Sequence, residues 1–552
     1  MSKEISITLW NIFNDRNAIS SNKLMEVFID SENIVEGKPL PISEDLCKQL
    51  YLKESPIVTY YDGEALDFVF EGVNYQLFNG NSIEISSCDR DNIYVRESIS
   101  LKANFNNYDS EKAYSDYESM FRHGSFNALV KNALPACAKG DKDAVKYLMW
   151  CVTVNQYLFL LSSKTLDFIE KQCKKNNPYA YFVSARCHYI LRNNENYSKL
   201  MTDRVKSAYY AGIPEAAALM AEMYRLGEFG LVDMLKYQQY INQALDEGCE
   251  FAMMLSVKRY IYGGLGFTAD KDKAFNTIDA AIKIGEETGS LNPHWYFLKG
   301  QALFTFSSSS AALPWYKKAV DNGCIFAYSD YALATGYNDN QELVDKESYL
   351  DILNQGKKKR DANSILLLAI NLEDDYDTFN DYFKWINAPK IINLLTEAYN
   401  LGSAIAAVYL GNIYYYGKFK TPENNDTAFE WYSKGALLGD YEGFEMLFVM
   451  VKYHYVDKDE NFKDMCALYG TRLGSKALLS ETVIAYTYGR LTEFASEIEQ
   501  YYCPIFDNEE GSKIDDENDK ISALQNAIDG DDAGDDLSDD GPDDDGRFDA
   551  WA

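Results

Sequence analysis

The sequence predicts a mainly α-helical protein: an α-solenoid of about ten helix-turn-helix repeats, between a small β-rich or α+β N-terminal domain and a disordered acidic C-terminal tail. Three observations predict this fold. Glycine and alanine recur in a unit of about 37 residues, β-branched and aromatic residues crowd the N-terminal part, and acidic residues crowd the C-terminal end. The 552 residues are enough for several domains or for one extended array.

The composition excludes several classes of protein. The net charge of −32, from 53 Lys and Arg against 85 Asp and Glu, disfavours a nucleic-acid binder, because phosphate contacts need a basic surface. Since no apolar run approaches the ~20 residues that cross a bilayer, and no signal peptide is apparent, we expect a cytoplasmic protein without membrane association. The ten cysteines contain no CxxC pair, so we expect reduced, buried thiols rather than a zinc or redox motif.

Residues 1–105 are predicted to form the β-rich or α+β domain. Residues 56–86 are rich in strand-forming types, and the pairs Asp62-Gly63 and Asn79-Gly80 are typical of hairpin turns. Residues 92–105 add a further strand or two. Residues 106–133 are expected to be a helical linker or cap.

The repeat is clearest in residues 402–439, and we number its positions from the opening glycine as zero. The positions that define it are Gly402, Ala406 at plus four, Leu410 and Gly411 at plus eight and nine, Tyr414 at plus twelve, and Gly417 at plus fifteen. This spacing is that of one helical face followed by a helix stop. A second helix is expected from Thr427 to Leu438.

The same grid recurs along residues 134–505, which we expect to form the array. The predicted openings are residues 140, 176, 212, 248, 285, 323, 356, 402, 439 and 474. A glycine at the opening supplies the left-handed conformation that ends the preceding helix. One helical hairpin cannot bury its apolar face alone, so stability is expected to come from stacking.

Two segments carry a family resemblance: AAVYLGNIYYYG (406–417) with AFEWYSKGALLG (428–439), and more loosely KAFNTIDAAIKIG (273–285). They resemble the Sel1-like repeat family, a relative of the tetratricopeptide repeats. The resemblance implies stacked α-hairpins whose first helices line a concave surface that binds a protein or peptide. In other units the Leu-Gly pair becomes Ser256-Val257 or Met220-Ala221, which departs from the family pattern.

The resemblance to tetratricopeptide repeats also places exposed concave positions near plus three, six, ten and thirteen. The candidate groove residues are Glu222, Arg225, Lys258, Ile261, Asn412 and Tyr415. Their mixture of charged, aromatic and aliphatic groups suits peptide recognition.

Residues 506–552 are predicted to be disordered because of their charge. From Asp507 onward the sequence has 18 acidic residues, and its basic residues are only Lys513, Lys520 and Arg547. The tip of this tail carries Phe548 and Trp551, which could dock into an apolar pocket rimmed by Lys and Arg. The alternative is a tail that only keeps the protein soluble.

No catalytic motif is apparent. The four histidines (His123, His188, His294 and His454) lie far apart in the sequence, and neither HExxH nor GxSxG occurs. We therefore predict no catalytic residue, metal or cofactor, and an interaction scaffold or adaptor as the function. Two alternatives stay open: an enzyme with its active site in the N-terminal domain and the repeats as a targeting module, and an acidic decoy or chaperone for basic partners. The sequence leaves the partner and the oligomeric state open.

Overall fold

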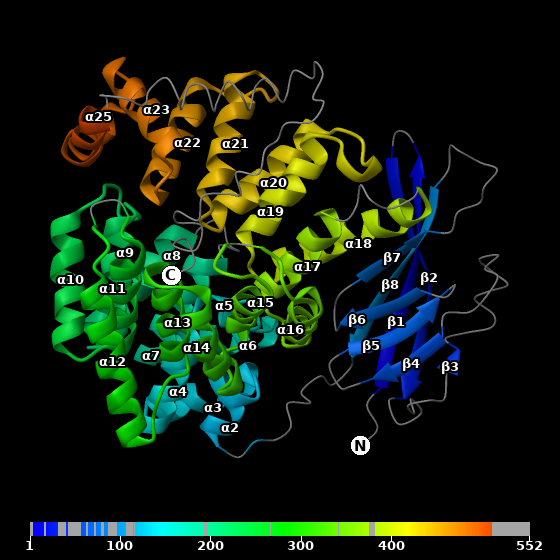
Figure 1. Cartoon of the computed structure of the whole chain (residues 1–552), viewed down its shortest axis with the longest axis horizontal. Helices are drawn as coiled ribbons and strands as arrows, with labels where there is room; N and C mark the ends of the chain where they lie inside the picture. Colours follow the sequence, from blue (N-terminus) through cyan, green and yellow to red (C-terminus); the bar gives the residue numbers. More distant parts are fainter. Residues whose placement is uncertain are drawn as a thin grey trace. The chain divides into compact units, whose positions relative to one another are not determined.

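The computed structural model describes residues 4–15, 18–30, 40–41, 57–61, 65–70, 73–78, 82–86, 96–105, 114, 116–191, 197–264, 267–340, 342–374 and 381–509. The chain divides into two compact units, Met1–Ser115 and Asp116–Ala552. Each is described by itself, and Figure 1 labels the elements of both.

The strands of the first unit form two antiparallel four-stranded sheets, in the orders β2-β1-β8-β7 and β3-β4-β5-β6. The strands are β1 (Glu4–Asp15), β2 (Ala18–Asp30), β3 (Leu40–Pro41), β4 (Ile57–Tyr61), β5 (Ala65–Phe70), β6 (Val73–Phe78), β7 (Ser82–Ser86) and β8 (Arg96–Phe105). The long β1–β2 pair had not been predicted, although apolar and polar residues alternate from Ile5 to Leu9.

One predicted hairpin of this unit is wrong. The strands on either side of Asn79-Gly80 belong to different sheets, because β6 pairs with β5 and β7 pairs with β8. The tight hairpin lies one strand earlier, where Phe70 is opposite Val73. The strands on either side of Asp62-Gly63 do pair, as expected.

The second unit is built from helical hairpins in succession (Figure 1). Their first helices are α7 (Pro178–Leu191), α9 (Pro214–Arg225), α11 (Glu250–Tyr262), α13 (His294–Phe306), α15 (Tyr328–Gly336), α17 (Ala362–Asp374), α19 (Ala404–Tyr415) and α21 (Tyr441–Lys452). The second helices are α8 (Tyr197–Tyr210), α10 (Met234–Asp246), α12 (Lys271–Thr288), α14 (Ser309–Asp321), α16 (Lys346–Lys358), α18 (Asp381–Asn400), α20 (Asn425–Leu437) and α22 (Glu460–Leu473). The mainly α-helical repeat fold is therefore confirmed.

The two ends of the array depart from this pattern. Before it lie α2 (Tyr117–Arg122), α3 (Phe126–Cys137), α4 (Lys142–Val152), α5 (Asn155–Leu158) and α6 (Ser163–Cys173). In the first predicted unit, α4 packs against α3, while α6 packs against α3 and α7. After the array lie α23 (Lys476–Thr487), α24 (Ala495–Glu497), the π-helical turn η6 (Ile498–Tyr502) and α25 (Cys503–Glu509). Helix α25 continues past the boundary predicted at residue 506, and the rest of the predicted tail lies outside the described residues.

Polar residues start the second helices of the hairpins. The side chain of the residue just before each helix accepts a hydrogen bond from the backbone N–H three residues later at Asp233, Asp270, Ser308, Asp345, Asn424 and Asp459. Each such cap satisfies an N–H group that the helix itself leaves unpaired, and is typically worth about 1 kcal/mol.

Most predicted openings have the expected left-handed backbone. Positive φ occurs at Gly140, Asn176, Gly212, Gly248, Gly323, Gly402, Gly439 and Gly474. Two predicted openings are wrong: Gly285 and Gly356 are helical, and the left-handed residues are Gly289 and Arg360, one turn later. Gly285 and Gly356 are needed instead for close packing, since a Cβ atom there would overlap Leu291 and Ser364.

Two glycines on first helices, Gly411 at plus nine and Gly300, have a packing role. A Cβ atom on Gly411 would lie 2.5 Å from the ring of Tyr432 on the second helix, and one on Gly300 would lie 2.5 Å from Tyr316. Tyr432 is buried, and its hydroxyl donates to Oδ1 of Asn412 at 2.7 Å. Small residues on the first helix thus let an aromatic ring of the second helix lie flat against it.

The second hairpin, α9–α10, contacts the end of the array. The backbone N–H of Val232 donates to Oε2 of Glu497 at 3.1 Å, and the N–H of Met234 donates to the hydroxyl of Tyr501 at 3.3 Å. The loop between α9 and α10 therefore packs against segments more than 200 residues later in the chain. Among the described helices, none combines the length and apolarity of a membrane span.

Candidate partner-binding site

The short helix α5 lies against the first helices of later hairpins, which we call the inner surface of the array. The ring of Tyr157 packs against Phe326 with centroids 5.5 Å apart. Phe326 in turn contacts His294 and Phe297 of α13, each at 5.1 Å between ring centroids. The chain itself thus covers part of the surface that was expected to be an open groove.

Arg186 of α7 holds this covering segment in place. Its guanidinium donates to the carbonyl oxygens of Val152 at 3.2 Å and Thr153 at 3.0 Å, and to Oδ1 of Asn155 at 2.5 Å. These carbonyls belong to the end of α4, where a cation is favoured. Burial lowers the pKa of Arg186 to about 10.

A second set of hydrogen bonds joins α4 to the inner surface. Glu250, at the start of α11, accepts hydrogen bonds from Nε1 of Trp150 at 2.8 Å and Nε1 of Trp295 at 2.6 Å. Burial raises the pKa of this carboxyl. The three residues come from α4, α11 and α13, so the contact fixes α4 against two successive hairpins.

A hollow of about 40 Å³ remains on the inner surface beside this segment. It is lined by the loop after α4 and by the first helices of four successive hairpins, α11, α13, α15 and α17, with the 3₁₀ turn η2 (Ile325–Ala327). The apolar lining consists of Val154, Phe251, Met254, Leu255, Phe297 and Phe326. The polar lining includes Asn155, Lys258, Tyr262, His294, Gln301, Asp330 and Asn363.

Two polar atoms of this lining are buried without a hydrogen-bond partner in the described part of the chain: Nδ1 of His294 and Oε1 of Gln301. The two side chains are 6% and 7% exposed, and buried polar atoms normally have a hydrogen-bond partner. Burial, together with the nearby charge of Lys258, lowers the pKa of His294 well below its usual value. Burial and the neighbouring Asp361 raise the pKa of Asp330 to about 7. Near neutral pH the hollow therefore contains a neutral imidazole and a partly protonated carboxyl.

Of the six predicted groove residues, Lys258 lines the hollow. Glu222 and Arg225 instead form a buried charge cluster with Arg259: Oε2 of Glu222 accepts from Nη2 of Arg225 at 2.8 Å and from Nη2 of Arg259 at 3.4 Å. Glu222 is buried and Arg225 is nearly so.

The remaining three predicted residues lie in or near the core. Ile261 is 1% exposed and Tyr415 is 7% exposed, and the ring of Tyr415 packs against Tyr455 with centroids 5.5 Å apart. Asn412 is half-buried, and its side-chain oxygen accepts the Tyr432 hydroxyl. The expected exposure is therefore not found at Glu222, Ile261 or Tyr415, because stacked hairpins bury these positions. Their contact with a partner stays a prediction.

The predicted groove positions (plus three, six, ten and thirteen) identify the lining of the hollow better than the six residues chosen from them. The hollow is lined by residues at plus three of three hairpins: Phe251, Phe326 and, counted from the observed opening at Arg360, Asn363. Sequence reasoning missed these because it sampled only plus ten and plus thirteen. Phe548 and Trp551 lie outside the described residues, as do the side chains of residues 1–105, where the alternative active site was placed.

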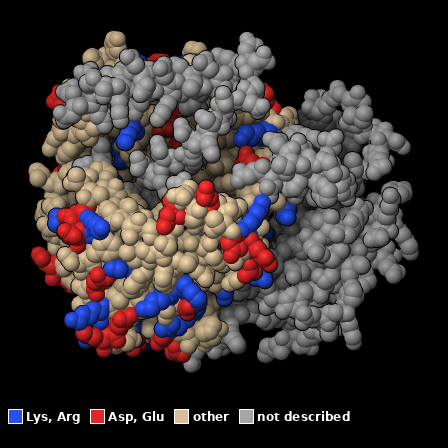
Figure 2. All heavy atoms as spheres, viewed as in Figure 1, with Lys and Arg blue, Asp and Glu red and all other residues tan. Residues whose placement is uncertain are grey.

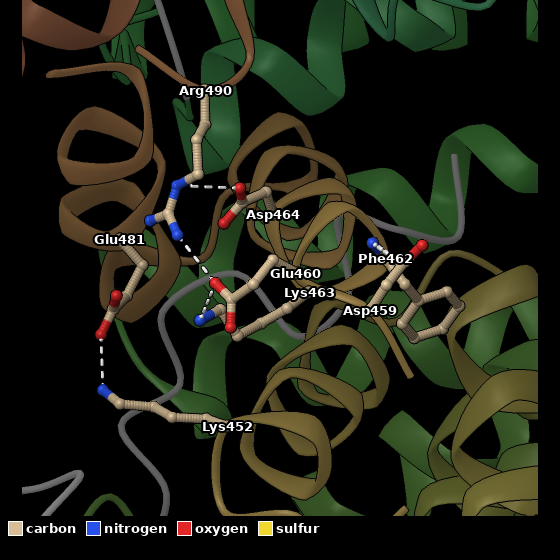
Figure 3. A network of polar contacts seen from close by, with 8 residues as sticks. All are labelled: Lys452, Asp459, Glu460, Phe462, Lys463, Asp464, Glu481 and Arg490. Atoms are coloured by element: carbon tan, nitrogen blue, oxygen red, sulfur yellow. Dashed lines mark hydrogen bonds and ion pairs between the residues drawn. The ribbon is translucent and has the colours of Figure 1, made fainter. Parts of the chain in front are cut away.

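Another polar network lies at the C-terminal hairpins and is shown in Figure 3. Arg490 contacts Glu460 at 2.7 Å and Asp464 at 3.1 Å, and Lys463 contacts Glu460 at 2.7 Å. Each of these charges faces an opposite one, which favours a structural role in joining α22 to the segment that follows α23. On the face of the molecule in Figure 2, basic and acidic side chains likewise lie next to one another over the described helices.

The described residues offer no cluster of three or more His, Cys, Asp or Glu side chains that could hold a metal ion. The thiols that the structure describes are free, and all except that of Cys503 are buried. Burial raises the pKa of Cys137 and of Cys466 to about 12, which keeps both protonated and unreactive.

The Sel1 repeat family model matches residues 279–324 and 404–440, which cover α13–α14 and α19–α20. These two segments of the chain match the Sel1 repeat. The two matched Sel1 segments contain the close pairs Gly300–Tyr316 and Gly411–Tyr432 described above. Sel1 repeat proteins are in general scaffolds for protein–protein contacts.

The solved structures that are similar to this chain include the following two. One is a protective antigen of uropathogenic Escherichia coli displaying an SLR fold, with 17% identity and a TM-score of 0.28, over 65% of this chain and 75% of the other. The other is a Sel1 repeat protein from Oxalobacter formigenes, with 17% identity and a TM-score of 0.31, over 60% of this chain and 94% of the other. No curated protein matches the sequence.

Proposed function

We propose that this Sel1 repeat chain is a protein-interaction scaffold that binds a partner protein or peptide at the inner surface of its array. The observation that carries the proposal is the hollow on that surface, which four successive first helices build together. A partner segment lying there would contact several hairpins at once, which is how repeat arrays gain binding area.

The contact residue favoured by the geometry is Lys258, a predicted groove residue that is half-buried at the hollow. Arg225 and Asn412 are the next candidates. Glu222, Ile261 and Tyr415 would take part only through a rearrangement of the hairpins, because they are buried in the free chain.

Further parts of the proposal concern the rest of the chain. Residues 1–105 would supply a second protein contact, and neither nucleic acid nor membrane would be a partner, in keeping with the net charge of −32. The buried free thiols support a reducing compartment such as the cytoplasm. No reaction is proposed.

Site-specific photo-crosslinking tests the proposal. A photoreactive amino acid at Lys258 of the full chain should capture a partner protein from a cell extract, whereas the same group at Lys283, an exposed position on α12, should not. Equal capture at both positions, or capture only through residues 1–105, would contradict binding at the inner surface.

A further inference from the structure

Two buried polar atoms that line the hollow on the inner surface lack hydrogen-bond partners among the described residues. Nδ1 of His294 and Oε1 of Gln301 come from one helix, α13, and line the same hollow without partners among the described residues. Leaving a buried polar atom unpaired costs free energy, roughly 1–3 kcal/mol. Two such atoms at one hollow indicate that another molecule supplies the missing contacts.

The charges around the hollow favour a negative ligand. Lys258 lines it directly, and Arg186 lies behind its wall, bonded to Thr153 and Asn155, which also line it. The guanidinium of Arg186 is also 5.1 Å from the ring centroid of Phe251, another lining residue. This basic environment stands out in a chain with a net charge of −32.

The remaining lining limits the size and charge of that ligand. A volume of about 40 Å³ holds a group of the size of a few water molecules. Asp330, on α15, would repel a dianion such as phosphate, and Lys258 would repel a cation. A carboxylate with one charge and a short apolar stem fits the polar groups and the Phe297 and Phe326 walls.

We propose that the hollow binds a carboxylate, the side chain of an aspartate or glutamate in a partner segment. Lys258 supplies the opposite charge, the ring nitrogen of His294 donates a hydrogen bond, and Gln301 accepts one from a backbone N–H of the segment. The inference rests on the proposed function, because it names the chemistry that the inner surface recognises.

The test uses the full chain with ¹³C-labelled histidine and two small probes, N-acetyl-glutamate methylamide and the neutral N-acetyl-glutamine methylamide. The glutamate probe should shift the imidazole resonance of His294 in a saturable way and leave that of His123, which is exposed, unchanged. The glutamine probe should bind at least about tenfold more weakly, the effect of one charge-assisted contact. Equal shifts from both probes would show that the hollow does not select for the carboxylate charge, and no shift from either would show that it holds only water; both results would overturn the proposal.

Variants locate the binding. Lys258→Met should weaken glutamate binding about tenfold, Lys258→Arg should restore most of it, and Lys283→Met should have no effect. Should Lys258→Met fold poorly, Gln301→Glu provides a second variant, since an added carboxylate repels the ligand. Unchanged affinity in the folded variants would overturn the proposal.

The source of the carboxylate is tested separately, because the chain's own acidic segment contains the same chemistry. A full-length variant with asparagine in place of each aspartate in 529–545 should bind the glutamate probe with unchanged affinity. A gain in affinity would overturn assignment to a partner, since the chain's own segment would then compete. Failure of the glutamate probe leaves capture at Lys258 intact, and failure of capture leaves probe binding intact, so the two proposals can fail independently.

Discussion

The guanidinium of Arg472 and the carboxylate of Glu497 form a buried ion pair of 2.7 Å, and through it the end of the array is joined to its second hairpin, α9–α10. Arg472 also donates to the carbonyl of Gly230 at 3.0 Å, while Glu497 accepts the N–H of Val232. The two side chains are 3% and 0% exposed. Gly227 has no room for a side chain, because a Cβ atom would lie 2.5 Å from the guanidinium carbon of Arg472.

Replacing Glu497 with glutamine should destabilise the protein by about 3 kcal/mol, because it leaves the buried charge of Arg472 without its partner. Urea unfolding measures this loss, and hydrogen exchange should show a less protected N–H at Val232. Glu493→Gln, at an exposed position of the same segment, should change stability by less than about 0.5 kcal/mol. Equal effects of the two substitutions would contradict a structural role for the pair.

Gly402→Ala should destabilise more than Gly474→Ala, although both glycines have positive φ, at 98° and 107°. An added Cβ meets nothing within 4 Å at Gly474, so only backbone strain of about 1 kcal/mol is expected there. At Gly402 it would overlap the ring of Phe159, which adds about 1–3 kcal/mol. Thermal unfolding of both variants tests the difference, and identical losses would show that Phe159 moves away freely.

Tyr415→Ala should lower stability by about 3–5 kcal/mol, since its buried ring packs against Tyr416, Tyr432 and Tyr455. The exposed surface position predicted from the sequence would have implied almost no change. Tyr488→Ala, at a side chain that is 78% exposed, is the matched control and should be nearly neutral. If the Tyr415→Ala protein had the same melting temperature as the wild type, Tyr415 would again be a candidate residue of the groove surface.

Glu170 should make stability depend on pH between about 4.5 and 2. Its contact with His188, followed by the hydrogen bond from Ser184 and the charge of Arg204, lowers its pKa to about 2. Because the folded state holds the proton less tightly than the unfolded state, the stabilisation is complete above about pH 4.5 and is lost as pH falls toward 2. Its size should stay below about 1 kcal/mol, since Glu170 is 37% exposed. Unfolding of Glu170→Gln across this range should show a smaller pH slope; an unchanged slope would contradict the assignment.

Asp330 should give the opposite dependence. Burial and Asp361 raise the pKa of Asp330 to about 7, so the folded state binds its proton more tightly than the unfolded state. Stability should then fall as pH rises from about 4 to 7 and level off above that. Asp330→Asn should flatten this decline in calorimetric scans. If stability fell by the same amount in the variant, the pH dependence would belong to a titratable group other than Asp330.

The repeat could be predicted from sequence because its signals are local. An opening glycine, a small residue at plus four and a glycine at plus fifteen each act within one hairpin, and the left-handed backbone at Gly402 and Gly417 bears this out. Gly285 and Gly356 were assigned wrongly because glycine serves two needs, a left-handed turn and close packing, and spacing alone does not separate them.

The candidate site depended on contacts that local patterns do not encode. The position of α5 is set by Tyr157 meeting Phe326 and by Arg186 meeting the end of α4, and neither pair has a sequence signature. The hollow arises only when four hairpins and this segment come together. Lys258 was identified because it lies at groove position plus ten, whereas His294 and Gln301, counted from the predicted opening at Gly285, fall outside the groove positions.

An array whose units contact only their neighbours unfolds from its terminal hairpins inward as temperature or denaturant concentration rises. The link between Val232 and Glu497 changes this expectation, because the final segment cannot detach without also uncovering the second hairpin, α9–α10. Insertions or deletions of a whole unit between them would displace both halves of the link. The number of hairpins in this stretch is therefore constrained by geometry, and lineages of this chain should gain or lose units elsewhere.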